Sequence, residues 1–136
     1  MKPTYRKAKG DKYERELARF LATCTGLVIE RAPLSGGGVI GQLSGGADLM
    51  GTPGLHVEAK RCERYLFEEW LRQTDAAISK THAPERPVIM ARKNGMRTED
   101  SLVVLRLGHF ADLYLAWLRH EGYVRTKKRD DLPPTD

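Results

Sequence analysis

The segment Gly51-Thr-Pro-Gly54 constrains the fold of this chain more than any other, because its composition predicts a tight turn. Residues 47–50 before the turn and residues 55–60 after it have the pattern of short strands. Two strands joined by so short a turn predict a hairpin. Such a hairpin brings the carboxylate of Asp48 close to that of Glu58.

Side chains alternate between two faces along the second strand, so Glu58 and Lys60 share one face. Two carboxylates beside an ammonium group are costly to hold together unless a cation neutralises the acids. Carboxylate oxygens suit Mg²⁺, and we expect Mn²⁺ to substitute for it. Lys60 would then orient a water molecule or steady a phosphate oxygen. The alternative is a surface hairpin in which Glu58 and Lys60 form a solvated ion pair of little energetic value.

The composition is that of one basic globular domain. The chain has 136 residues and a formal net charge of +5, which favours a polyanionic partner, nucleic acid first. No apolar run approaches the ~20 residues of a membrane span. No signal-peptide pattern opens the sequence, so we expect a cytoplasmic protein with no membrane partner. Cys24 and Cys62 lie far apart without metal-type spacing, and a disulfide is not implied.

Hydrophobic periodicity predicts an α/β fold with a central mixed sheet flanked by helices. The order is helix, strand, strand, strand, helix, strand, strand, helix, and we expect the last two strands to be antiparallel. The predicted helices span residues 9–24, 66–80 and 110–119, and the predicted strands span residues 27–31, 47–50, 55–60, 87–91 and 102–106. We expect a flexible basic arm over residues 1–8, one domain over residues 9–121 and a disordered tail over residues 122–136.

The glycine-rich run 32–46 predicts a loop that leads into Asp48. Within it, Gly36-x-Gly38-x-x-Gly41 matches the dinucleotide-binding pattern. That pattern must open a helix, whereas further glycines and Pro53 follow here. We therefore expect no nucleotide cofactor, and the run fits a loop around a ligand or a simple connector.

Several short motifs, taken together, resemble the PD-(D/E)XK nuclease superfamily, and most closely the archaeal-type Holliday-junction resolvases and their phage-encoded relatives. The order and spacing of the motifs are more specific than any one of them. They are Lys9-Gly10-x-x-x-Glu14-Arg15, Arg31-Ala-Pro-Leu-Ser35-Gly36, Asp48, and Glu58-Ala59-Lys60. The resemblance covers residues 9–106 and implies a restriction-endonuclease-like core.

The resemblance also implies roles for particular residues. The implied catalytic residues are Glu14, Ser35, Asp48, Glu58, Lys60 and Gln73. The implied metal ligands are Asp48, Glu58, the backbone carbonyl of Ala59 and, directly or through water, Glu14. Two departures from the family pattern matter, because Ala47 replaces the Pro of the motif and Ser44 competes with Ser35 for the serine role. For Glu14 alone, the alternative is an exposed acid paired with a neighbouring base.

Basic residues near these motifs are candidates for contacts with the DNA backbone. They are Arg31, Arg61, Arg64, Arg92 and Lys93. Such contacts supply affinity without sequence information. Ordinary solvated surface charge is an equally good interpretation of any single one of them.

The family implied by the motifs cuts branched DNA, so we expect a metal-dependent endonuclease that resolves four-way junctions in recombination and repair. The expected products are a 5′-phosphate and a 3′-hydroxyl, and the expected assembly is a homodimer, because junctions are two-fold symmetric. Apolar residues of the second or the last helix could form the dimer interface. The small size fits a phage gene, whose product would act in the host cytoplasm, as well as a cellular gene. The alternatives are a related nuclease acting on linear duplex or flaps, and a DNA-binding protein without catalysis.

Overall fold

The computed structural model describes residues 5–33, 46–81 and 84–125. The chain divides into two compact units, residues 1–104 and residues 105–136. The predicted catalytic motifs all belong to the first unit, and the last helix belongs to the second. The boundary falls inside the range 9–121, whose extent as one domain stays a prediction.

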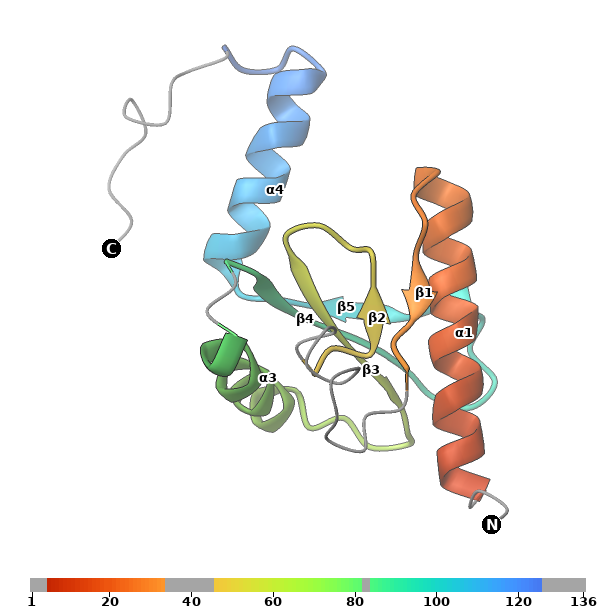
Figure 1. The fold of residues 1–136 in the computed structure, drawn as a ribbon. Coiled ribbons are helices and arrows are strands. Elements are labelled where there is room, and N and C mark those ends of the chain that lie inside the picture. Colours follow the sequence, from red (N-terminus) through yellow and green to blue (C-terminus); the bar gives the residue numbers. More distant parts are fainter. Residues whose placement is uncertain (1–4, 34–45, 82–83, 126–136) are drawn as a thin grey trace. The chain divides into compact units, whose positions relative to one another are not determined.

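Among its described residues, the first unit contains two long helices and five short strands, in the order expected (Figure 1). The elements are α1 (Tyr5–Thr25), β1 (Glu30–Arg31), β2 (Leu49–Met50), β3 (Leu55–Arg61), α3 (Phe67–Thr81), β4 (Arg86–Arg92), the 3₁₀ helix η1 (Thr98–Asp100) and β5 (Leu102–Val104). Helix α1 begins at Tyr5, so half of the segment expected to be a basic arm is helical instead. The physical reason is that Arg, Lys and Ala, which follow Tyr5, are strong helix formers.

Strands β3, β4 and β5 form a mixed sheet in which β4 is central. Strand β3 runs parallel to β4, with Glu58 opposite Ile89 and Lys60 opposite Ala91. Helix α3 supplies the crossover that parallel strands need. Strand β5 is antiparallel to β4, which confirms the orientation predicted for the last two strands.

Each face of this sheet is covered by a helix, which is why β4 is buried from Pro87 to Arg92. On one face Ile89 and Ala91 pack against Trp70 of α3. On the other face the guanidinium group of Arg92 lies over the ring of Tyr13 of α1. The predicted α/β architecture, a central mixed sheet flanked by helices, is therefore confirmed.

The predicted hairpin is wrong in its pairing. Strand β2 pairs with β1 in a separate antiparallel ladder, with Arg31 opposite Leu49, and not with β3. Strand β3 is held to this ladder through one residue, because the N–H of Asp48 donates to the carbonyl of Val57 at 2.9 Å. The pairing differs because a backbone N–H on the free edge of β3, that of Ala59, donates to the side chain of Asp48 and not to a strand.

The turn after β2 depends on Gly51. Its φ of +89° lies in the region that favours glycine. A Cβ atom there would overlap the carbonyl oxygen of Val28, which lies just before β1. The chain can therefore pass close to β1 and turn towards β3 only with glycine at this position.

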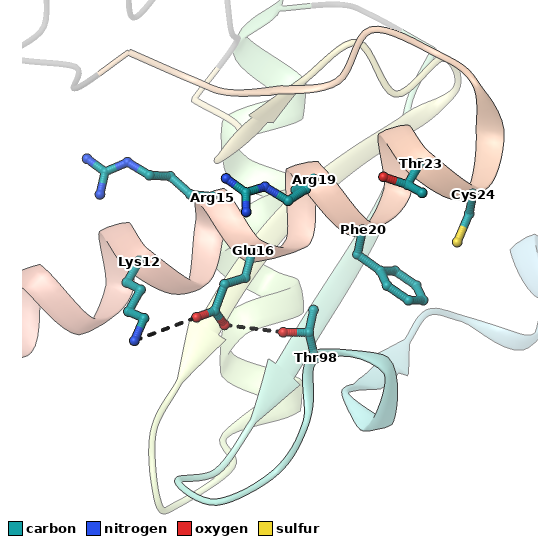
Figure 2. A pocket seen from close by; sticks show the side chains of 8 residues that line it. All are labelled: Lys12, Arg15, Glu16, Arg19, Phe20, Thr23, Cys24 and Thr98. Atoms are coloured by element: carbon teal, nitrogen blue, oxygen red, sulfur yellow. Dashed lines mark hydrogen bonds and ion pairs between the residues drawn. The ribbon is translucent and has the colours of Figure 1, made fainter.

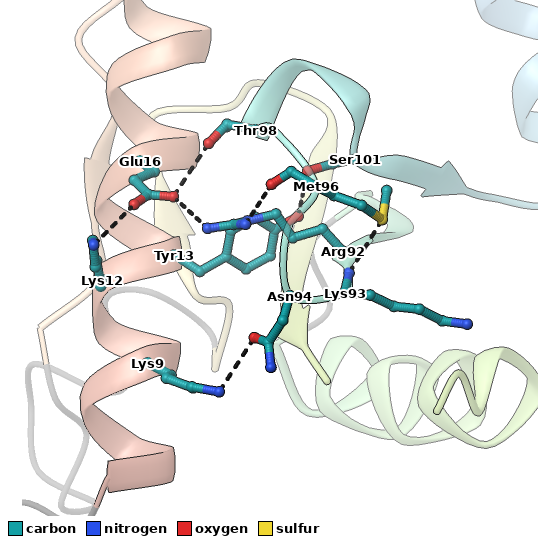
Figure 3. Close-up of polar contacts among 10 residues, drawn as sticks. All are labelled: Lys9, Lys12, Tyr13, Glu16, Arg92, Lys93, Asn94, Met96, Thr98 and Ser101. Atoms are coloured by element: carbon teal, nitrogen blue, oxygen red, sulfur yellow. Dashed lines mark hydrogen bonds and ion pairs between the residues drawn. The ribbon is translucent and has the colours of Figure 1, made fainter. Parts of the chain in front are cut away.

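A polar network ties α1 to the segment that follows β4 (Figure 3). The Nη2 of Arg92 donates to Glu16 Oε2 at 2.8 Å, and its Nη1 donates to the carbonyl of Met96 at 2.5 Å. The hydroxyl of Tyr13 donates to Ser101 Oγ at 2.8 Å, and burial raises the pKa of Tyr13 to about 12. Arg92 thus stabilises the packing of α1 against the sheet.

The second unit is built on α4 (Leu107–His120). The helix ends in a Schellman motif, because the N–H of Tyr123 donates to Leu118 O at 2.9 Å and that of Gly122 donates to Arg119 O at 3.2 Å. Gly122 has a φ of +81°, as this motif requires. Within the described parts of the chain, no helix combines the length and apolar character needed to cross a membrane.

Candidate active site

The central feature of the site is a hydrogen bond from strand β3 to a side chain. The backbone N–H of Ala59 donates to Asp48 Oδ2 at 2.8 Å. Ala59 lies between Glu58 and Lys60, so this bond fixes the Asp48 carboxylate beside both of them. The approach of the two carboxylates predicted from the sequence is therefore present, although the two strands form no ladder.

The two carboxylates repel one another in a partly buried position. Burial, and next the charge of Asp48, raise the pKa of Glu58 to about 8. Burial also raises the pKa of Asp48, although the hydrogen bond from Ala59 and the charge of Lys60 oppose the rise. Without a cation, the pair therefore holds a proton near neutral pH.

Lys60 lies on the same face as Glu58 and close to it. Its Nζ is 3.9 Å from Glu58 Oε1, at the outer limit of an ion pair. The same ammonium group lies 5.6 Å from the centroid of the Trp70 ring. Trp70 is buried in the core and therefore gives Lys60 a rigid surface to lie against.

Glu14 is held by an arginine rather than left free. Arg31 Nε donates to Glu14 Oε2 at 2.6 Å, and Arg31 Nη2 donates to Asp11 Oδ1 at 2.6 Å. Burial, followed by the charge of Asp48, raises the pKa of Glu14, and the bond to Arg31 opposes the rise. Glu14 is thus close enough to Asp48 to sense its charge, while Arg31 fixes its orientation.

The donor set fits a divalent cation of the magnesium type. Among the residues that the structure describes, no group of three or more His, Cys, Asp or Glu side chains is arranged to hold a metal. Mg²⁺ is commonly bound by one or two carboxylates, with water and substrate phosphate completing its shell. Asp48 and Glu58 supply two such carboxylates, and a cation would replace the proton that they now share.

The other residues predicted for the site have different positions. Ser35 and Ser44 lie outside the described residues. Gln73 is exposed on α3, where its Nε2 donates to Glu69 Oε1 at 3.5 Å, so its catalytic role stays a prediction.

The predicted DNA contacts divide into two groups. Arg92 is only 7 % exposed, so we withdraw the DNA contact predicted for it. Arg31 is occupied by two carboxylates, which makes it a positioning residue in this geometry. Arg64 and Lys93 are exposed and Arg61 is half-buried, so these three remain candidates.

A pocket in the described part of the chain lies away from these carboxylates. It has a volume of about 630 Å³ and lies along α1 and η1, where Phe20 and Thr98 contribute to its lining (Figure 2). Its single carboxylate, Glu16, is already paired with Lys12 at 4.0 Å and with Arg92 at 2.8 Å. This pocket therefore lacks the free acid that metal-dependent chemistry requires.

Two residues contribute to the site in ways that local patterns do not predict. The pattern around Trp70 indicates only an apolar helix face, and Arg31 is predicted only to contact DNA. Trp70 carries no local signal, because its contact with Lys60 depends on the crossover. The two partners of Arg31 carry a local signal, because Asp11 and Glu14 are three positions apart and therefore share one face of a helix.

Comparison with known proteins identifies the family. Residues 5–129 match the family model described as "Phage putative PDDEXK endonuclease". No curated protein and no solved structure matched the chain. The family match covers the first helix, the Asp48–Glu58–Lys60 cluster and α4. The chain therefore belongs to this phage PD-(D/E)XK endonuclease family.

Proposed function

We propose that this protein is a Mg²⁺-dependent DNA endonuclease that cuts with Asp48, Glu58 and Lys60 and acts on branched DNA. The observation that supports this site most strongly is the 2.8 Å hydrogen bond from Ala59 to Asp48. This bond holds the carboxylates of Asp48 and Glu58 together, and the pKa of each is raised. Two ionised carboxylates so close together cost stability unless a cation neutralises them. Membership of an endonuclease family supports DNA as the substrate.

Asp48, Glu58 and the carbonyl of Ala59 would hold a divalent cation, which would supply an activated water and neutralise charge on the scissile phosphate. Lys60 orients the attacking water, or stabilises the charge of the pentacovalent phosphorus, by donating hydrogen bonds. Trp70 limits the positions that its ammonium group can take. Cleavage in this way leaves a 5′-phosphate and a 3′-hydroxyl.

Glu14 acts as a third acid, through water rather than as a direct ligand, because one of its oxygens is bonded to Arg31. Ser35, or Ser44 in its place, contacts a phosphate or the water network. Gln73 belongs to the site only if it exchanges its bond to Glu69 for one to substrate.

The four-way junction is the substrate that the motifs favour. A junction resolvase must cut two strands related by two-fold symmetry, and a homodimer with two sites matches that symmetry. Arg61, Arg64 and Lys93 would contact the DNA backbone. The alternatives are linear duplex or flap cleavage by the same site, and DNA binding without cleavage.

The test compares Mg²⁺-dependent cleavage of a labelled four-way junction with that of matched linear duplex, single strand and flap. Asp48→Asn and Lys60→Ala are assayed beside the wild type, and Asn94→Ala, an exposed change elsewhere, serves as the control. We expect paired symmetric nicks in the junction that disappear in both site variants. Cleavage of every substrate would support the proposed catalytic site but contradict the preference for junctions, and the substrate would then be DNA in general. Tight junction binding without cleavage would contradict catalysis.

A further inference from the structure

A row of aromatic rings in the first unit leads away from Lys60. The Nζ of Lys60 lies 5.6 Å from the centroid of the Trp70 ring. Phe67 meets Trp70 edge to face at a centroid distance of 5.6 Å, and Tyr65 stacks on Phe67 at 4.8 Å with 22° between the ring planes. We call these three residues the aromatic row. Its far end carries a second lysine, because Lys93 Nζ lies 4.9 Å from the centroid of the Tyr65 ring.

The Tyr65 ring at the end of the row is fixed from several sides. Phe67, on which it stacks, packs against the core. The hydroxyl of Tyr65 donates to Met96 Sδ at 3.5 Å. The turn before Met96 is joined to the segment before Tyr65, because the N–H of Asn94 donates to Glu63 Oε1 at 2.8 Å. Since little side-chain entropy remains to be lost, such a ring binds a flat partner at a lower entropic cost than a flexible ring does.

The group that covers the other face of Tyr65 can be exchanged. Phe67 occupies one face of the ring, so the Lys93 ammonium group covers the opposite face. Lys93 is exposed, and in Figure 3 its side chain extends away from α1, whereas the Arg92 guanidinium group points towards α1. An ammonium group over an exposed ring is held more weakly than a stacked nucleic-acid base. A base can therefore replace the ammonium group on the ring.

The position of the row relates this ring to the proposed cut. Lys60 is the residue proposed above to act at the scissile phosphate, and each step from it to Tyr65 is 5.6 Å or less. Bases follow one another at ~3.4 Å along a strand, so Tyr65 lies a few nucleotides from that phosphate. In an intact duplex, neighbouring pairs cover both faces of a base. Extruding a base costs unstacking energy, which is smallest for a base that is already unpaired.

We propose that Tyr65 stacks on one unpaired base close to the cleaved phosphate, and that Lys93 then pairs with a phosphate of the same strand. The inference rests on the proposed nuclease function, since it takes the position of the cut from Lys60. It narrows the substrate to DNA that presents an unpaired nucleotide beside the cut, such as a flap or a junction opened at its centre. Stacking is tolerant of base identity, so this contact adds no sequence preference.

The experiment measures binding of the full chain in EDTA, so that no strand is cut. The probes are a flap that carries iodouracil at the unpaired positions next to the branch, and a matched linear duplex that carries iodouracil in the same sequence. Irradiation links iodouracil to an aromatic ring stacked on it, and mass spectrometry of the digested complex identifies the ring. We expect a link at Tyr65 with the flap and none there with the duplex.

Three variants separate stacking from packing and from charge. Tyr65→Leu keeps an apolar side chain without the ring, and it should weaken flap affinity about tenfold, the order that one stacked base contributes, with duplex affinity unchanged. Tyr65→Phe removes only the hydroxyl, and it should keep both the flap affinity and the link at position 65. Lys93→Ala should weaken flap and duplex binding by the same factor, because a phosphate contact does not depend on base pairing. Circular dichroism checks that every variant keeps its helix content.

A photochemical link at another residue, or equal losses of flap and duplex affinity in Tyr65→Leu, would overturn the assignment. The cleavage assay is scored separately. Flap binding through Tyr65 without metal-dependent cleavage would count against the proposed function alone. Cleavage that requires Asp48 but is indifferent to Tyr65→Leu on every substrate would count against this inference alone.

Discussion

The backbone N–H of Ala59 donates a 2.8 Å hydrogen bond to the side chain of Asp48. This bond replaces the strand ladder that the local sequence predicts between the two segments. It joins a residue of the β1–β2 ladder to the strand that carries Glu58 and Lys60. The alignment of the three side chains therefore depends on one side chain and one amide, and several consequences can be measured.

Arg31 should control cleavage through Glu14. Arg31→Lys keeps the charge but cannot hold Glu14 and Asp11 together at 2.6 Å each. We expect kcat to fall about tenfold with little change in KM, because Glu14 is then no longer held in a fixed position. In a Glu14→Gln background the same change should cost much less, because Arg31 then has no acid to orient. Equal losses in both backgrounds would show that Arg31 acts elsewhere. Asp11→Asn, which changes the other acid bound to Arg31, serves as the control.

Gly51 and Gly95 form a matched pair for stability. Both have positive φ, +89° and +83°, but a Cβ at Gly51 would overlap Val28 O whereas Gly95 has open space around it. Gly95→Ala should cost only the backbone strain, ~1 kcal/mol, and Gly51→Ala on the order of 3 kcal/mol. Chemical denaturation measures both free energies of unfolding. Similar values for the two variants would show that the Val28 contact is readily relaxed.

Arg92 should matter for stability rather than for DNA. Arg92→Ala breaks the bonds to Glu16 and Met96 and leaves Glu16 without its closest cation, which should cost about 3 kcal/mol. Lys93→Ala, in the next and exposed position, should change stability by less than ~0.5 kcal/mol. Conversely, only Lys93→Ala should reduce the salt dependence of DNA affinity. Thermal unfolding and binding titrations at several salt concentrations give both quantities.

The metal-free protein should lose stability as the pH rises towards 8. The pKa of Glu58 is raised in the folded chain, to about 8, so the folded state holds a proton that the unfolded state releases at lower pH. The stabilisation is therefore complete below the unfolded pKa and disappears as pH passes through the folded one. We expect the Tm in EDTA to fall by several degrees between pH 5 and pH 8. In a domain of about 100 residues, a loss of 1 kcal/mol in unfolding free energy lowers Tm by ~4–8 °C.

Glu58→Gln should flatten this profile, since the amide does not titrate. Addition of Mg²⁺ to the wild type should raise Tm more at pH 8 than at pH 6, because the cation competes with the shared proton. A flat wild-type profile would mean that Glu58 is ionised in the folded protein throughout this range.

Local sequence patterns are sufficient to predict the fold class, the element order and the spacing that brings Asp48, Glu58 and Lys60 together. Hydrophobic periodicity and turn residues are local properties, so they predicted the helices, the β4–β5 antiparallel pair and the turn at Gly51. The family motifs added Glu14, because their spacing is also local. For Arg31, the same motif predicted a contact with DNA.

Local patterns do not predict which polar groups contact one another, because these contacts form only when distant segments pack together. Arg31 and Arg92 look alike in the sequence, but one orients Glu14 and the other is buried against Tyr13. The β1–β2 pairing and the contact between Trp70 and Lys60 join segments that are distant in the chain. Burial and ion pairing depend on what the rest of the chain places opposite a side chain. Hydrophobic periodicity along the sequence does not predict that partner.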